Sequence, residues 1–472
     1  MPTSITNKNV ALVHRKEPQF MTPAPANTSA GAFMISSLKE DDKIAMYVAS
    51  ATVHYLYHAN EDAWVQIPSG ALVGTFGAGS CGVKTRWSNT YTANGGGSTT
   101  TATTATQLTG LVKGYTLRVL TGANAGQERV VTDILTTVGG STTLYFAAFP
   151  NAIANTDTFA ISSGRFFILN AGTQAAGSFK SYDLLTSTWT SQTITGLPAT
   201  WGTDGVLVNT ASYDVIATGT ATSASVSTLV NSTKTWTVNQ WANYQVRITA
   251  GTGIGQVRNI ASNTATALTV SANWTVTPDA TTVYELTGND DFIYALGNNA
   301  VTMYRYQIST NTWTTLAPTV ARTGAPGAAL SANWIPTIST TGWNNESDIR
   351  NGRYIYSFRG AGGGLLDRYD IALNTWLAIP YNALTEIFTT GTSYTFIDRH
   401  IYIRKDATGR MFKFSIAGNY MEPIATTLIP EGTAVAGRKM WGMKYIENGE
   451  AKLTWIYYLQ NSGNLLHRIL LF

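Results

Sequence analysis

The segment YQISTNTW, residues 306–313, places a tyrosine seven positions before a tryptophan. If the turn is centred on Ser309 and Thr310, a hairpin sets Tyr306 directly opposite Trp313, so both rings leave the same face of the ribbon. The spacing recurs in YHANEDAW, YDLLTSTW and YDIALNTW, and a diverged copy reads FSIAGNYM. The residues of these copies are Tyr57 and Trp64, Tyr182 and Trp189, Tyr369 and Trp376, and Phe414 and Met421. A repeated ribbon with one aromatic face needs similar neighbours to bury that face.

A second short apolar strand precedes each hairpin at a nearly constant distance. These strands lie at 41–48, 163–170, 290–297, 351–358 and 398–405, with a sixth at 451–459. With inner strands from segments such as 71–79, 205–210 and 392–397, the pattern predicts six meandering repeats. Repeats of about 40–50 residues of this kind are typical of β-propellers. We therefore expect an all-β fold with a six-bladed β-propeller formed by residues 31–87, 163–212 and 289–472.

The last repeat reaches the end of the chain, Phe472, on its third strand. Closed propellers avoid an exposed edge, so we expect another segment to supply the fourth strand. The candidate is Val10–Val13 in an N-terminal arm of residues 1–30, with residues 18–30 as the connector. The alternative is that this arm pairs with another subunit.

Two stretches between strands, 88–162 and 213–288, are too long to be loops. Each begins with a Thr/Gly/Ser tract that is typical of a linker. Each then carries the same motif, in the first copy at Tyr115, Arg118, Gly122, Gly126, Gln127 and Arg129, and in the second at Tyr244, Arg247, Gly251, Gly255, Gln256 and Arg258. Both stretches fall between the first and second strands of consecutive blades. We expect two homologous small β-domains, here called module 1 (88–162) and module 2 (213–288), that project side by side.

The glycine-rich part of the motif lacks the Lys-Ser/Thr of a phosphate-binding loop and sits between strands rather than before a helix. A bulged hairpin with left-handed glycines explains it better, with the glutamine and arginine side chains bonding to the backbone of the turn. Contacts with neighbouring molecules are expected at the two hairpin tips, at Ala123, Asn124, Thr252, Gly253 and Ile254.

The composition of the chain limits the classes of protein to which it can belong. Only 12% of residues are charged, about half of the usual 25%, whereas 44% are hydrophobic, which argues against disorder. The net charge of +4 is scattered along the chain, so nucleic acid is not an expected partner. The single cysteine, Cys81, excludes an internal disulfide framework. We see no apolar run as long as a membrane span and no signal peptide. A virion protein, made in the host cytoplasm and released by lysis, fits this combination.

We predict no catalytic residue, cofactor or metal ion. The aspartates at 41–42, 290–291 and 398 each open a strand, which turn formation explains. The five histidines, at 14, 54, 58, 400 and 467, show no converging copper-ligand pattern, and no Ser/His/Asp arrangement stands out. Four tryptophans outside the hairpins, Trp201, Trp334, Trp343 and Trp441, are candidates for stacking on a sugar, although packing is the commoner role of such residues.

The Tyr/Trp hairpins with their preceding apolar strands resemble Kelch repeats over about 300 residues, a likeness that implies topology but not activity. The Gly-Gly pair that usually ends the second strand is missing, with Gly297, Asn298 and Gly360 as partial counterparts. The module motif, followed by ASNTATALTVSANWTVTPDATTVYEL in the second copy, is similar to a module of bacteriophage tail, fibre and appendage proteins. A propeller with inserted β-domains also resembles the tail-nozzle proteins of short-tailed phages.

These resemblances imply a structural component of a bacteriophage particle, placed at the tail, neck or collar. It would act by protein–protein assembly with other virion proteins and with copies of itself. The alternative is a propeller that recognises a host-surface glycan, and a third reading is a galactose-oxidase-like enzyme.

Overall fold

The structure is a computed structural model of the chain. The residues that it describes are 19–25, 33–35, 44–49, 52–59, 61–68, 70, 80–95, 97–108, 112–137, 140–202, 205–209, 215–296, 302–320, 330–336, 349–358, 365–380, 393–397, 400–405, 410–415, 418, 420–424, 440–447, 450–459 and 466–470.

The described residues form strands and no α-helix, and six of their sheets have four antiparallel strands each. The first three sheets are β2 (Phe33–Ile35), β3 (Ile44–Val48), β4 (His54–His58) and β5 (Ala63–Ile67); β6 (Cys81–Lys84), β13 (Arg165–Leu169), β15 (Phe179–Asp183) and β16 (Thr188–Ser191); and β18 (Val206–Asn209), β26 (Phe292–Leu296), β27 (Met303–Gln307) and β28 (Thr312–Leu316). The other three are β29 (Leu330–Pro336), β30 (Ile349–Phe358), β31 (Leu365–Asp370) and β32 (Thr375–Pro380); β33 (Ser393–Ile397), β34 (His400–Arg404), β35 (Met411–Ser415) and β36 (Tyr420–Ile424); and β37 (Met440–Glu447), β38 (Glu450–Leu459), β39 (Leu466–Leu470) and β1 (Gln19–Met21). A separate two-stranded sheet is formed by β14 (Gly172–Thr173), which follows β13 in the sequence, and β17 (Thr200–Trp201), which follows β16.

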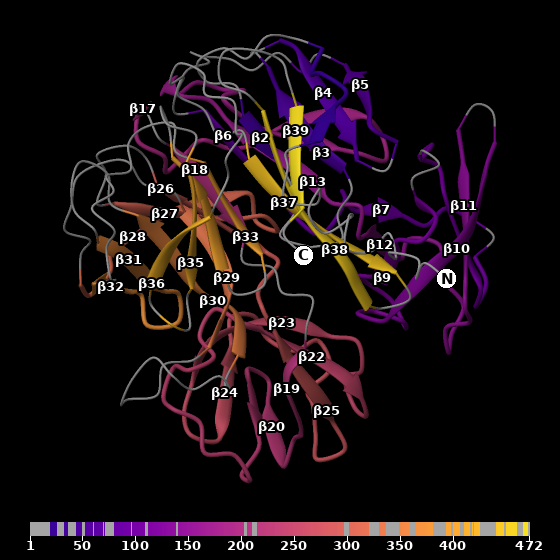
Figure 1. Ribbon diagram of the computed structural model, residues 1–472. Coiled ribbons are helices and arrows are strands. Elements are labelled where there is room, and N and C mark those ends of the chain that lie inside the picture. Colours follow the sequence, from indigo (N-terminus) through magenta and orange to yellow (C-terminus); the bar gives the residue numbers. More distant parts are fainter. Residues whose placement is uncertain are drawn as a thin grey trace, which may run out of the picture.

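The six sheets form a ring. Their first strands contact one another in cyclic order, from β2 through β6, β18, β29 and β33 to β37, which contacts β2 again. Buried side chains fill the space between successive sheets, as where Met46 of β3 packs with Phe166 and Ile168 of β13. Figure 1 shows the outer strands β5, β28 and β32 at the rim of this body. The fold is therefore all-β and propeller-like, and we call these six sheets the ring.

The aromatic hairpins have the register that their spacing predicts. Tyr306 pairs with Trp313 across β27 and β28, and the other copies show the same cross-strand pairing, at Tyr57 with Trp64, Tyr182 with Trp189, Tyr369 with Trp376, and Phe414 with Met421. The two rings of each Tyr/Trp pair lie 4.8 to 5.2 Å apart between centroids. All four tyrosines are buried, because the preceding sheet covers the aromatic face.

The last sheet takes its outermost strand from the N-terminal part of the same chain. β1 pairs with β39, with Phe20 opposite His467, and Met21 packs on a cluster that contains Leu466 and Trp455. Two expectations need correction here. The pairing strand, Gln19–Met21, lies in the stretch that we expected to be a connector, while Val10–Val13 lies outside the described residues. The innermost strand of the second sheet is Cys81–Lys84, after the expected segment 71–79.

The two insertions are small sheets that share the order of six strands, and module 2 adds a seventh, β20, at one edge. Module 1 runs β7 (Tyr91–Thr92), β12 (Thr158–Ile161), β9 (Thr116–Val119), β10 (Glu128–Thr136), β11 (Thr142–Phe146) and β8 (Thr101–Thr104). Module 2 runs β19 (Val215–Thr220), β25 (Val283–Thr287), β22 (Gln245–Ala250), β23 (Val257–Asn263), β24 (Ala267–Val270), β21 (Thr228–Val230) and β20 (Ser223–Ser225). Each has its own buried core, and each follows the first strand of its ring sheet, β6 or β18.

Candidate functional site

The two modules meet through equivalent glycines of their motifs. Gly126 and Gly255 both have a left-handed backbone, with φ of 82° and 90°, which glycine adopts without a steric penalty. A Cβ atom placed on Gly126 would overlap the carbonyl oxygen of Gly255, and one placed on Gly255 would overlap that of Ala125. The backbones of the two hairpins are therefore in direct contact, and any larger residue at either position would force the modules apart.

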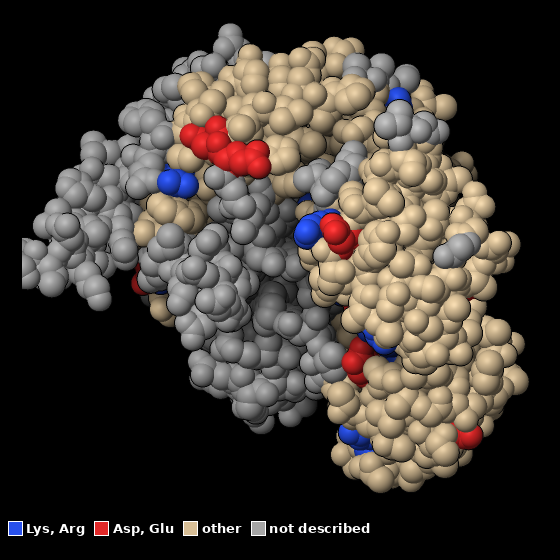
Figure 2. Space-filling model, turned by 90° about the vertical axis from the view of Figure 1, so that its right-hand side faces the viewer, with Lys and Arg blue, Asp and Glu red and all other residues tan. Residues whose placement is uncertain are grey.

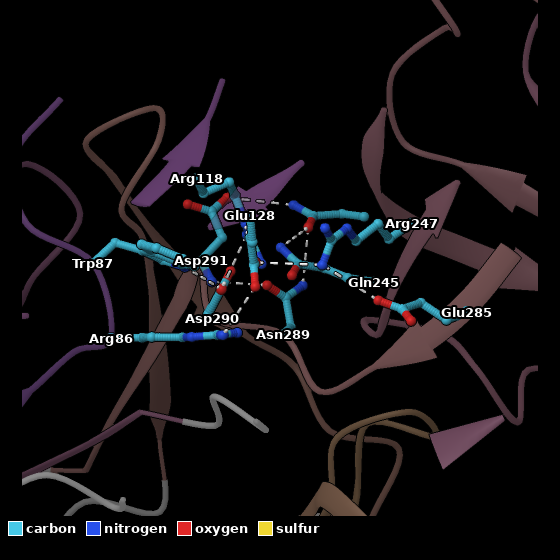
Figure 3. Close-up of polar contacts among 11 residues, drawn as sticks. Arg86, Trp87, Arg118, Glu128, Gln245, Arg247, Glu285, Asn289, Asp290 and Asp291 are labelled. Carbon is cyan, nitrogen blue, oxygen red and sulfur yellow. Dashed lines mark hydrogen bonds and ion pairs between the residues drawn. The ribbon is translucent and has the colours of Figure 1, made fainter. Parts of the chain in front are cut away.

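A single carboxylate beside this contact joins both modules to the ring (Figure 3). Glu128 Oε1 lies 2.7 Å from Nη2 of Arg118 in module 1 and 3.4 Å from Nη1 of Arg247 in module 2. Its Oε2 lies 3.7 Å from Nη2 of Arg86, which follows β6 of the ring. Arg118 and Arg247 occupy the same position of the motif, so Glu128 is shared by equivalent arginines of the two modules.

Two further acids complete the charge balance around these arginines. Arg118 Nη1 lies 3.5 Å from Oδ2 of Asp290, and Arg247 Nη1 lies 3.5 Å from Oε1 of Glu285. Asp290 also accepts a 2.6 Å hydrogen bond from the indole Nε1 of Trp87. We call these seven residues the junction: Arg86, Trp87, Arg118, Glu128, Arg247, Glu285 and Asp290.

The Trp87 indole contacts two cations of the junction. The guanidinium of Arg118 is 4.3 Å from its ring centroid and that of Arg86 is 4.6 Å away. A guanidinium over a partly buried indole face gains electrostatic attraction and keeps its donors free for carboxylates. Trp87 thus couples the ring, from which it comes, to module 1.

Module 2 is also held to the ring by uncharged donors and acceptors. Asn259 of β23 accepts hydrogen bonds from Gln245 and Asn289, and donates to Oδ2 of Asp291. Asp291 also accepts from the backbone N–H and the hydroxyl of Ser309 at the tip of the ring hairpin. This aspartate, read from the sequence as a turn former, therefore also binds module 2.

The junction shifts the pKa values of its members. Burial tends to raise the pKa of Glu128, but Arg118, Arg86 and Arg247 together hold it below its ordinary value. Burial is the main reason that the pKa of Arg247 is lowered, against the opposing effect of Glu128. Next to the junction, burial raises the pKa of Asp291. Glu128 is thus ionised at neutral pH and acts as the common anion of the arginines.

Several motif residues stabilise their own module. Arg129 and Arg258 donate to the carbonyl oxygens of Ala148 and Asn273. The Gln256 side chain donates to the Val276 carbonyl and accepts from its N–H. The structure describes no side-chain bond of Gln127. Tyr115 and Tyr244 accept the same backbone bond, from Val131 and Ile260, and Gly122 and Gly251 both have positive φ.

The hairpin tips differ from what we expected. Asn124 is fully buried and bonds to the backbone of Asn151, so it is unavailable to a neighbouring molecule. Ala123 and Ile254 are exposed, while Thr252 and Gly253 are partly covered. The tip contact that the structure does contain is the one between the two modules, which no single copy of the motif could reveal.

Sequence reasoning missed a repeated polar contact at the aromatic hairpins. The residue two positions before each tryptophan, namely Asp62, Ser187, Asn311 or Asn374, has a positive φ. In three hairpins its side chain accepts the hydrogen bond of the paired tyrosine hydroxyl, at 2.7 to 2.8 Å. Asn and Asp adopt this backbone more readily than other non-glycine residues, so the signal was present in the sequence.

These hairpins also hold the chain that leaves the preceding sheet. Trp313 Nε1 donates to the Thr193 carbonyl just after β16, and Trp189 Nε1 donates to the Pro68 carbonyl just after β5. The same contact closes the ring, because Trp64 Nε1 donates to the Thr22 carbonyl just after β1. Three of the six sheets are thereby bonded to the exit of the preceding sheet, one of them to the exit of β1.

The remaining candidates lie apart from the junction. Trp201 is buried against Leu207 and Tyr304, whereas the side chains of Trp334, Trp343 and Trp441 lie outside the described residues. Cys81 is buried. Within the described ranges, no three His, Cys, Asp or Glu side chains gather as a metal site requires, and no helix is long and apolar enough to span a membrane.

Comparison with known proteins adds little. No family model and no curated protein matches the chain. Among solved structures, a chain of the mitotic checkpoint complex and U3-55K both match at 8% identity with a TM-score of 0.36, over 96% of this chain and 92% and 98% of theirs. Both are WD40-type β-propellers. At this TM-score the matches carry no argument, and the propeller-like description rests on the sheet order and the ring of strand contacts.

Proposed function

We propose that this protein is a structural component of a bacteriophage particle, associated with the tail, neck or collar, that acts by protein–protein assembly. The observation that carries the proposal is the junction. Three arginines, two of them from equivalent positions of the modules, share the Glu128 carboxylate and so fix both modules to the ring. A rigid body that displays two β-domains in one orientation suits an assembly part better than a flexible binding arm.

The surface supports the same proposal. On the face in Figure 2, charged side chains are sparse: opposite charges adjoin in some places, and elsewhere small groups of one sign stand apart, as in the red patch near the top. Large single-sign fields steer polyanions or charged substrates, and this face has none among the described residues. A polar, nearly uncharged surface is compatible with packing against other subunits over large areas.

We further propose that the ring is a six-bladed Kelch-like propeller. The Tyr/Trp hairpins support this assignment, since each pairs in register and bonds to the exit of the preceding sheet. The resemblance of the module motif to phage tail, fibre and appendage modules supports placement in a virion.

The test is to look for the chain in particles. Particles purified from a lysate of cells that carry the gene would be analysed by mass spectrometry and labelled with antibodies raised against modules 1 and 2. We expect the chain in stoichiometric amounts in the particles and antibody label at one end. A chain found only in the soluble fraction would refute the proposal. For the glycan-binding alternative, Trp201, the described member of its tryptophan set, is buried and so is not available to stack on a sugar.

A further inference from the structure

The outer face of module 1 carries an apolar strip that the fold of the module does not require. Val130 and Leu135 of β10 and Tyr145 of β11 expose 53%, 54% and 37% of their surface. Tyr145 pairs with Asp133, between the positions of Val130 and Leu135 along β10, so the three side chains lie on one face. The opposite face, with Val131 and Leu144, is the buried core.

Module 2 provides an internal comparison. The shared motif and a β-bulge at the same place, between Val131 and Asp133 in module 1 and between Ile260 and Ser262 in module 2, align the two copies. The counterparts of Val130, Leu135 and Tyr145 are Asn259, Thr264 and Thr269. Since module 2 forms the same sheet with polar residues at all three positions, folding does not explain the apolar strip. Exposed apolar side chains that cluster on one copy alone indicate a binding surface.

The corresponding face of module 2 is itself a docking surface. Asn259 bonds there to Asn289 and Asp291 of the ring-side segment. In module 1 the same position, Val130, is exposed. At this position module 2 binds the ring-side segment, whereas module 1 leaves Val130 exposed, next to the junction residues Glu128 and Arg118 on the same face.

The charges on this face fit a second copy of itself. Lys113 Nζ lies 3.6 Å from Asp133 Oδ1, and both side chains are largely exposed. Their counterparts in module 2 are Ala242 and Ser262, so this pair is also specific to module 1. In a two-fold interface every contact occurs twice, because residue i of one copy meets residue j of the other and residue j meets residue i. One lysine and one aspartate beside an apolar strip satisfy that requirement, with Lys113 of each copy facing Asp133 of the other.

We propose that the outer face of module 1, formed by Lys113, Val130, Asp133, Leu135 and Tyr145, is a surface through which two copies of this chain associate about a two-fold axis. This inference rests on the proposed function and deepens it by naming a partner. The apolar strip supplies the buried centre of the interface and the charged pair its polar rim.

The first test replaces the strip in the full-length chain by the residues of module 2, as Val130→Asn, Leu135→Thr and Tyr145→Thr together. Sedimentation velocity should show that the wild type dimerises and that the variant has a dimer Kd raised at least about tenfold. The matched control is Val226→Thr, Val238→Thr and Val276→Thr, which changes three exposed valines of module 2 and should leave the Kd unchanged. A monomeric wild type at high micromolar concentration, or an equal effect of the control, would overturn the proposal.

The second test uses the charges. Lys113→Asp and Asp133→Lys should each weaken self-association, since each places like charges opposite one another across the axis. An equimolar mixture of the two variants should form a heterodimer with nearly the wild-type Kd, because each chain then presents the charge that the other lacks. A mixture that stays monomeric would overturn the two-fold arrangement.

The proposed function is tested separately. A monomeric chain that is still incorporated into particles would refute this surface but not the assembly role.

Discussion

Removal of the shared carboxylate, by Glu128→Gln, tests whether the junction holds the modules. The substitution keeps the size of the side chain, and among the described residues it leaves Asp290 as an ion-pair partner of Arg118 and Glu285 as one of Arg247. Removing one partner of a fully buried ion pair costs about 3–5 kcal/mol. Glu128 retains 19% exposure, and glutamine can still accept a hydrogen bond, so we expect a loss of about 2–3 kcal/mol.

The control is Asp133→Asn in the same module. Asp133 is 69% exposed and has one described ion pair, with Lys113, so its loss should cost about 0.5 kcal/mol or less. Urea unfolding would give the free energies, and hydrogen exchange of β9, β10 and β22 would show whether the loss is local to the junction. Equal costs for the two variants would refute the account of the junction.

The pH dependence gives a second check of the same variant. Because the folded-state pKa of Glu128 is lowered, the carboxylate stabilises the protein above its unfolded pKa of about 4.3. That contribution is lost as pH falls through the folded-state pKa, where the native carboxylate becomes protonated. The wild type and Glu128→Gln should therefore converge in stability at acid pH. A difference that stays constant down to pH values below both pKa values would contradict the ionic role.

Three further substitutions test other contacts, each by urea unfolding. Gly126→Ala should cost about 2–4 kcal/mol of stability, because the overlap with Gly255 adds to the strain of a left-handed backbone. Its control, Gly95→Ala, should cost about 1 kcal/mol, because Gly95 has a φ of 72° but open space around it. Similar costs for the two variants would argue against the glycine contact. Trp313→Phe removes the donor to the Thr193 carbonyl and should cost about 1–3 kcal/mol, with faster hydrogen exchange at the link between the second and third sheets; unchanged exchange there would count against that bond. Burial lowers the pKa of His54 to about 4, so as pH falls the unfolded chain takes up this proton before the folded chain does. Stability should therefore fall by about 3 kcal/mol between pH 6.5 and 4. His54→Leu should flatten that pH dependence of stability, and an unchanged slope would refute the assignment.

The repeat structure was predictable because it is written in local spacing. A Tyr and a Trp seven residues apart define a hairpin without reference to the rest of the chain, and every described copy has the expected register. The left-handed glycines of the module motif were predictable for the same reason, since Gly122 and Gly251 belong to short turns. Local geometry depends on neighbours in sequence, which a single chain displays.

The junction was not predictable, because its members come from four separated segments. Glu128 stands in the motif that the sequence analysis quoted, yet its counterpart in module 2 is Val257, so comparison of the two copies gave it no role. Trp87 and Asp290 lie 203 positions apart and are joined by one hydrogen bond. The closing strand was misplaced for a related reason: many short apolar segments can supply a fourth strand, and packing against Leu466 and Trp455 selects Gln19–Met21.

The sequence by itself thus determined the all-β class, the hairpin register and the presence of two homologous insertions, because period and turn chemistry act over a few residues. Only the tertiary structure decided which equivalent residues of the modules face each other, which carboxylate the arginines share and which strand closes the ring. Those choices depend on the relative placement of bodies that are distant in the chain, where one contact excludes another by sterics and by charge.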